Sequence, residues 1–133
     1  MPKLSYTQAF HAFGAKLVNR MWAYSAVASD GSIVVSCWSH KLKLQDGVLT
    51  YTDRLSRWEP NPPGKNLLIE HLTKARDESL PVRLVIATTD RPDVVDRGEV
   101  ANTIAKTFHV KPEVVGKVVL FDGDNFSLEF SRK

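Results

Sequence analysis

Aromatic and cationic residues that could hold a flat, anionic ligand are concentrated in the first half of the chain. All three tryptophans, Trp22, Trp38 and Trp58, lie there, together with Tyr51. Bases stack on aromatic rings and phosphates pair with Lys and Arg, so this combination is typical of a surface that binds nucleic acid. Aromatic residues in strands are also ordinary core residues, and core packing is the alternative for each tryptophan.

The segment 51–66 is the densest part of this half. Its prolines and its glycine predict an irregular, stiffened loop, and a preorganised loop loses little entropy on binding. Gly64 and Lys65 at the start of a predicted helix suit one phosphate, although they also fit plain loop residues. The candidate nucleic-acid-binding residues are Arg54, Arg57, Trp58, Lys65, Asn66, Lys41 and Lys43. A possible aromatic pocket would be formed by Trp22, Trp38 and Tyr51.

Size and charge fit a small binding domain. The 133 residues predict one globular domain, 1–133, and the 43% hydrophobic and 25% charged residues are ordinary for a folded protein. The net charge is +3, and residues 1–58 carry seven Lys or Arg against three Asp. The basic excess therefore lies in the same half as the tryptophans. A charge of this size is compatible with nucleic acid as a partner and does not require it.

The sequence predicts a cytoplasmic protein without a membrane partner. No apolar run approaches the roughly 20 residues of a membrane-spanning helix, and the N-terminus does not resemble a signal peptide. The single cysteine, Cys37, lies in an apolar strand-like run, which indicates a buried structural thiol.

Catalytic and metal-binding patterns are missing from the sequence. The histidines are scattered, and no Cys/His pair has the spacing of metal ligands. There is no nucleophile elbow and no phosphate-binding glycine loop. His71 is interpreted as a solvated helix residue. We therefore expect no catalytic residues, no metal and no cofactor, and the sequence favours a protein that is not an enzyme.

The elements that would position these residues follow from patterning. A capping box at Ser5 predicts a helix over 6–18, and Asp-Gly pairs at 30–31 and 46–47 predict hairpins that join strands at 21–29, 32–44 and 48–54. A change of phase near residue 40 indicates a bulge or bend. Later elements are a helix at 67–78 capped by Asn66, a central strand at 81–89, a helix at 97–108 and a C-terminal hairpin.

The predicted fold is α+β, with a curved, mostly antiparallel sheet of about six strands. Its order is helix, three-stranded meander, helix, central strand, helix and C-terminal hairpin. The first part of this order is similar to the core of the restriction-endonuclease-like nucleases. Such sites need an acid on the second strand and an acid-x-Lys pair on the third. Here the second strand has no acid, and Asp53 is followed by Arg54 and Leu55.

Three functions are compatible with these features. The favoured one is a non-catalytic nucleic-acid-binding domain that uses the basic and aromatic surface around 51–66, with DNA preferred to RNA. The second is a small protein-interaction or inhibitory module that docks on a larger enzyme through the terminal hairpin or the Trp58 loop. The third is a degenerate, metal-dependent nuclease that uses Asp53 or Glu59.

Overall fold

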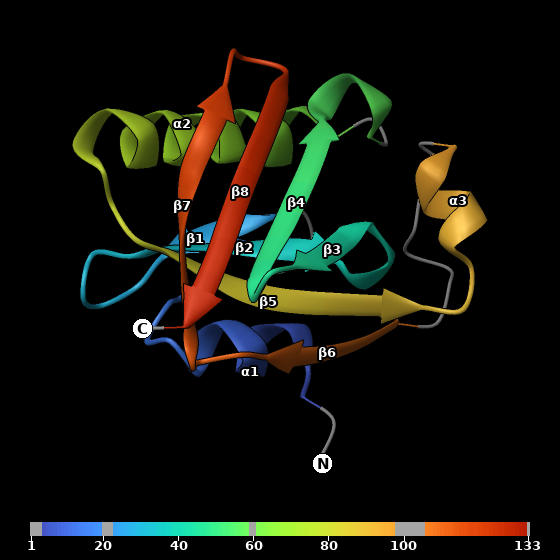
Figure 1. Cartoon of the computed structure of the whole chain (residues 1–133), viewed down its shortest axis with the longest axis horizontal. Coiled ribbons are helices and arrows are strands. Elements are labelled where there is room, and N and C mark those ends of the chain that lie inside the picture. Colours follow the sequence, from blue (N-terminus) through green and yellow to red (C-terminus); the bar gives the residue numbers. More distant parts are fainter. Residues whose placement is uncertain (1–3, 20–22, 59–60, 98–105, 133) are drawn as a thin grey trace.

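The fold is α+β and is built on a mostly antiparallel, open sheet (Figure 1). The computed structural model describes residues 4–19, 23–58, 61–97 and 106–132. In these residues eight strands pair in the order β1-β2-β5-β7-β8-β4-β3, with β6 added to β5. The strands are β1 (Ser25–Val27), β2 (Ile33–Trp38), β3 (Leu42–Gln45), β4 (Val48–Arg54), β5 (Val82–Thr89), β6 (Lys106–Val110), β7 (Val114–Phe121) and β8 (Asn125–Arg132).

The expected bend near residue 40 divides the long predicted strand in two. A short 3-10 helix, η1 (Ser39–Lys41), separates β2 from β3. The expected meander is therefore present as two hairpins, β1–β2 and β3–β4, which lie at opposite ends of the sheet. Both Asp-Gly turns are confirmed, and Asp46 (φ 53°) and Gly47 (φ 79°) both have the positive φ that a tight hairpin turn requires.

The helices differ from the predictions at their ends. α1 (Tyr6–His11) begins with the predicted capping box, in which Ser5 and Gln8 bond each other's backbone N–H, but it ends well before residue 18. α2 (Pro62–Glu78) begins before the predicted Asn66, because Asn61 caps it by accepting a hydrogen bond from the Gly64 N–H. The prediction that the prolines exclude regular structure here was wrong, since proline is tolerated in the first helical turn.

The predicted helix over 97–108 was wrong at its C-terminal end. Residues 106–110 form β6, which pairs antiparallel with β5, and residues 98–105 lie outside the described residues. A short helix, α3 (Pro92–Asp96), follows β5. The ring of Phe108 packs on the ring of Tyr6, with 5.1 Å between centroids. This tertiary contact stabilises Phe108 in a strand, although the sequence predicted it in a helix.

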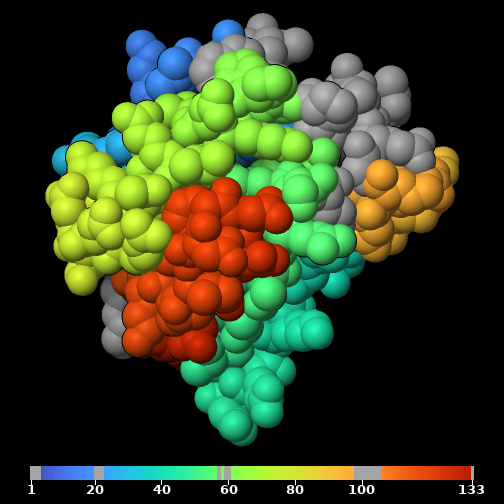
Figure 2. Space-filling model, turned by 90° about the horizontal axis from the view of Figure 1, so that it is seen from above, coloured from blue at the N-terminus to red at the C-terminus, as the bar shows by residue number. Residues whose placement is uncertain are grey.

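Two apolar clusters lie on opposite sides of β1, β2 and β5. The larger cluster packs α2 on the sheet through residues such as Leu72, Leu84 and Phe130. The smaller cluster lies between α1 and the sheet, around Phe10 (Figure 1). The β3–β4 hairpin projects from the surface in Figure 2, and its Leu44 is 71% exposed. Within the described residues, no helix is both long and apolar enough to cross a membrane.

Candidate functional site

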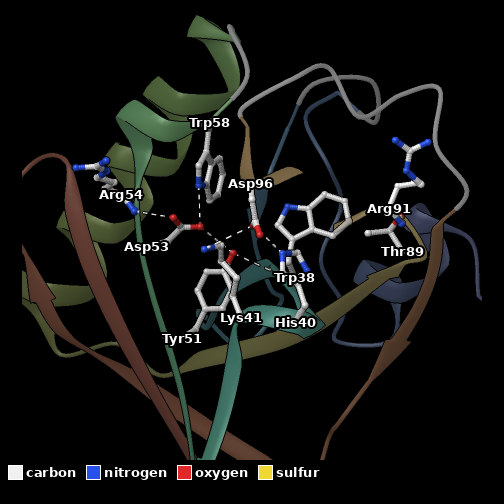
Figure 3. Close-up of polar contacts among 10 residues, drawn as sticks. All are labelled: Trp38, His40, Lys41, Tyr51, Asp53, Arg54, Trp58, Thr89, Arg91 and Asp96. Carbon is white, nitrogen blue, oxygen red and sulfur yellow. Dashed lines mark hydrogen bonds and ion pairs between the residues drawn. The ribbon is translucent and has the colours of Figure 1, made fainter. Parts of the chain in front are cut away.

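The candidate site lies where β2 and β4 end (Figure 3). β2 ends at Trp38, β4 brings Tyr51 and Asp53, and the 3-10 helix η2 (Leu55–Arg57) leads to Trp58. Sequence positions 20 residues apart are thus brought together because the chain turns back at η1 and at the β3–β4 turn. We call Trp38, Tyr51, Asp53 and Trp58 the indole cluster.

A hydrogen-bond network centred on Asp53 holds the indole cluster together. The Asp53 carboxylate accepts from Trp58 Nε1–H (2.9 Å), from the Tyr51 hydroxyl (3.3 Å) and from the Arg54 backbone N–H (2.8 Å). The Tyr51 oxygen in turn accepts from the Trp38 backbone N–H at 3.4 Å. Asp53 is 8% exposed, and a buried carboxylate is stable only when donors surround it. The network thus links the backbone of Trp38 to the indole of Trp58 through Tyr51 and Asp53.

The two indoles of the cluster are held to different degrees. Trp58 meets Tyr24 and Phe126 edge to face, with centroid distances of 4.8 Å and 6.0 Å, in addition to its bond to Asp53. Trp38 packs on the same core cluster and has a tilted contact with His40 at 6.2 Å. Both side chains are half-buried. Trp58 is thus anchored by a side-chain hydrogen bond and two aromatic rings, whereas Trp38 is bonded to the cluster through its backbone N–H.

A second polar group adjoins the cluster and connects α3 to the bend of the sheet. Asp96 in α3 lies 2.9 Å from His40 Nε2 and 3.7 Å from Lys41 Nζ (Figure 3). His40 and Lys41 both belong to η1, directly after Trp38. Asp96 therefore holds His40 and Lys41 next to Trp38.

The structure separates the predicted basic residues into two sets. Along β4, Tyr51 and Asp53 are buried on the inner face of the sheet, whereas Thr52 and Arg54 are exposed on the outer face. Lys43 pairs with Thr50 and is exposed, so it belongs with Arg54 on the outer face. In Figure 3 the Arg54 side chain points away from the indole cluster. Of Lys41, Lys43 and Arg54, it is Lys41 that lies beside the indole cluster (Figure 3).

The remaining predicted site residues have other placements. Lys65 Nζ donates to the Trp58 carbonyl oxygen at 3.1 Å, so it supports the segment that carries this indole. Asn66 is exposed in the first part of α2 and does not cap the helix. Trp22 and the side chain of Arg57 lie outside the described part of the chain.

Three features were missed by sequence reasoning, two of them at the site. Asp96 and Tyr24 come from segments 58 residues after and 14 residues before Trp38, and no local pattern connects them with it. The third surprise is His71, which is buried and not solvated: its Nδ1 lies 2.7 Å from the hydroxyl of buried Ser25. Burial lowers the pKa of His71, and the nearby Lys74 contributes in the same direction.

The chemistry available at the site is that of stacking, hydrogen bonding and ion pairing. Cys37, next to Trp38 on β2, is fully buried as predicted, and burial raises the pKa of its thiol, with the charge of Asp53 adding to this effect. Among the described residues, no group of three or more His, Cys, Asp or Glu side chains is arranged to hold a metal ion. The arrangement combines half-buried indoles with neighbouring cations and carboxylates.

Comparison with known proteins gives no relative from which a function could be transferred. No protein-family model, curated protein or solved structure matches this chain. The functional conclusion therefore depends on the residues of the site itself.

Proposed function

We propose that this protein is a non-catalytic nucleic-acid-binding domain whose indole cluster contacts a base. The hydrogen-bond network that links Trp38 to Trp58 through Tyr51 and Asp53 is the observation that supports this proposal most strongly. Two half-buried indoles joined by one network offer aromatic surface to a flat ligand, and base stacking on such side chains is largely independent of sequence.

Cations on both faces near this end of the sheet are suited to the phosphates. Lys41 lies in η1, three residues after Trp38. Arg54 is the last residue of β4 and is exposed on the outer face of the sheet. Arg57, Lys65, Lys43 and Asn66 remain secondary candidates from the sequence. Phosphate contacts position a nucleic acid and carry no base information. The base contact would therefore come from the indoles, and we propose DNA in preference to RNA.

The test is a titration of the purified protein with single- and double-stranded DNA and RNA, followed by tryptophan fluorescence at about 50 and 200 mM salt. Nucleic acid should quench the fluorescence, and the affinity should fall steeply with salt because counterions are released on binding. Lys41→Ala and Arg54→Ala should each reduce the slope of log affinity against log salt by about 1. Lys74→Ala is the matched control, because Lys74 is exposed on α2 away from the cluster and should leave the slope unchanged.

The absence of binding to every nucleic acid in the panel would overturn the proposal. Docking on a protein partner would then be the better hypothesis. The observation that favours this second function is a pair of exposed apolar side chains on β7 of the terminal hairpin, Val119 (43% exposed) and Leu120 (51% exposed). Apolar side chains of this kind are suited to a protein interface that tolerates moderate salt.

A further inference from the structure

The placement of the indole cluster on the inner face of the sheet restricts the form of nucleic acid that can reach it. Tyr51 is fully buried and Asp53 nearly so, and both point inward from β4. The neighbouring exposed residues of the same strand, Thr52 and Arg54, point to the outer face. In Figure 3, Trp38 lies on the other side of Asp53 and Tyr51 from Arg54, so a ligand on Trp38 is held away from the outer face of β4.

A base inside an intact duplex cannot make this approach. Its two faces are covered by neighbouring base pairs, so it must leave the stack before it can lie on an aromatic side chain. An unpaired base already has a free face, and unstacking costs least at a mismatched or single-stranded position. A half-buried indole thus favours unpaired over paired bases without any contact to a base edge.

The two indoles have different parts in such a complex. Trp58 has aromatic neighbours in Tyr24 and Phe126, and its Nε1–H is bonded to Asp53, so it is a positioning residue that shapes the site. Trp38 is half-buried, ends β2, and directly precedes η1, which carries His40 and Lys41. The backbone N–H of Trp38 bonds to Tyr51, and this holds the residue without using its ring.

We infer that the site selects unpaired or extruded bases over paired ones, with Trp38 as the stacking surface and Lys41 beside it for the adjoining phosphate. This inference rests on the proposed function and names its ligand more closely. Two carboxylates hold the side chains around that surface. Asp53 accepts a hydrogen bond from Trp58, and Asp96 lies within ion-pair distance of Lys41 and His40.

The experiment compares fluorescence anisotropy for three labelled DNA ligands of the same sequence: a single strand, a duplex with one bulged base, and a perfect duplex. We expect the single strand and the bulged duplex to bind at least about tenfold more tightly than the perfect duplex, because one base stack on an aromatic side chain is worth a factor of this order. Trp38→Ala should remove this preference by weakening the binding of the single strand and of the bulged duplex.

Two further variants separate stacking from folding. Trp38→Phe keeps an aromatic face and should keep most of the preference, whereas Trp38→Leu keeps apolar bulk without a π-face and should lose it. Near-ultraviolet circular dichroism and urea midpoints of all three variants report whether the core is intact. Salt-dependent binding that is equal for the three ligands and insensitive to Trp38 would overturn the inference and leave the proposed function standing. No binding to any ligand would overturn both.

Discussion

Replacement of Asp53 by alanine tests whether its carboxylate is the centre of the indole cluster. The change removes the acceptor of two well-formed hydrogen bonds, from Trp58 Nε1–H at 2.9 Å and from the Arg54 N–H at 2.8 Å. The third bond, from the Tyr51 hydroxyl at 3.3 Å, is long, and that hydroxyl can rotate toward another partner. Loss of Asp53 therefore leaves two donors without their acceptor.

The expected cost follows from these two bonds. A hydrogen bond to a charged group contributes about 1.5–3 kcal/mol, and both donors are only partly buried, so water can replace some of the loss. Asp53→Ala should lower the free energy of unfolding by about 3 kcal/mol, measured by urea unfolding with far-ultraviolet circular dichroism. Asp77→Ala is the control. Asp77 is an exposed acid paired with Arg76 at 2.9 Å, and a surface pair of this kind contributes about 0–1 kcal/mol.

A double-mutant cycle assigns the loss to the Asp53–Trp58 contact. Trp58→Phe keeps an aromatic ring and removes the indole donor, so its cost should be smaller in the Asp53→Ala background than in the wild type. We expect a coupling free energy of about 1–2 kcal/mol. The reasoning is refuted if Asp53→Ala costs no more than Asp77→Ala, or if the two substitutions are additive.

Two further predictions concern residues outside the cluster. Burial lowers the pKa of His71 below its usual value of about 6.5, so the unfolded chain binds the proton more readily and stability should fall as the pH drops below about 6.5. Urea midpoints at several pH values should show this decline, His71→Gln should flatten it, and an equally steep decline in the variant would contradict the assignment. Gly116→Ala should cost about 1–3 kcal/mol by overpacking, because a Cβ there would meet the Phe130 ring and lie 2.7 Å from the Glu129 carbonyl oxygen. A loss below about 0.5 kcal/mol in urea unfolding would show that the strands separate easily at this point.

Local patterns predicted the elements whose signals lie within a few neighbouring residues. The capping box of α1, the two Asp-Gly turns, the bend near residue 40 and the apolar strand β5 are all confirmed. In each of them, a side chain or a backbone conformation is fixed by the residues next to it. Cys37 was recognised as buried for the same reason, since the apolar run around it leaves little choice.

Local patterns failed where a distant segment supplied the stabilising contact. Residues 106–108 lie in strand β6, although the sequence predicted a helix there. They pair with the edge of β5, and the ring of Phe108 contacts the ring of Tyr6. One failure was local: α2 begins earlier than predicted because its first turn accepts the two prolines and Asn61 caps it. His71 is buried because Ser25, 46 residues before it, lies beside it in the folded chain.

The sequence by itself determined an α+β domain in which aromatic and basic residues share one half of the chain. Only the tertiary structure decided which of these residues act together. Strand pairing places Lys43 and Arg54 on the outer face and Tyr51 and Asp53 on the inner face. The bend at η1 and the return of β4 bring Trp38 to Trp58, and α3 brings Asp96 to Lys41. Alternation along a strand is visible in a sequence, but which face is covered depends on what packs against it, and that is a property of the whole fold.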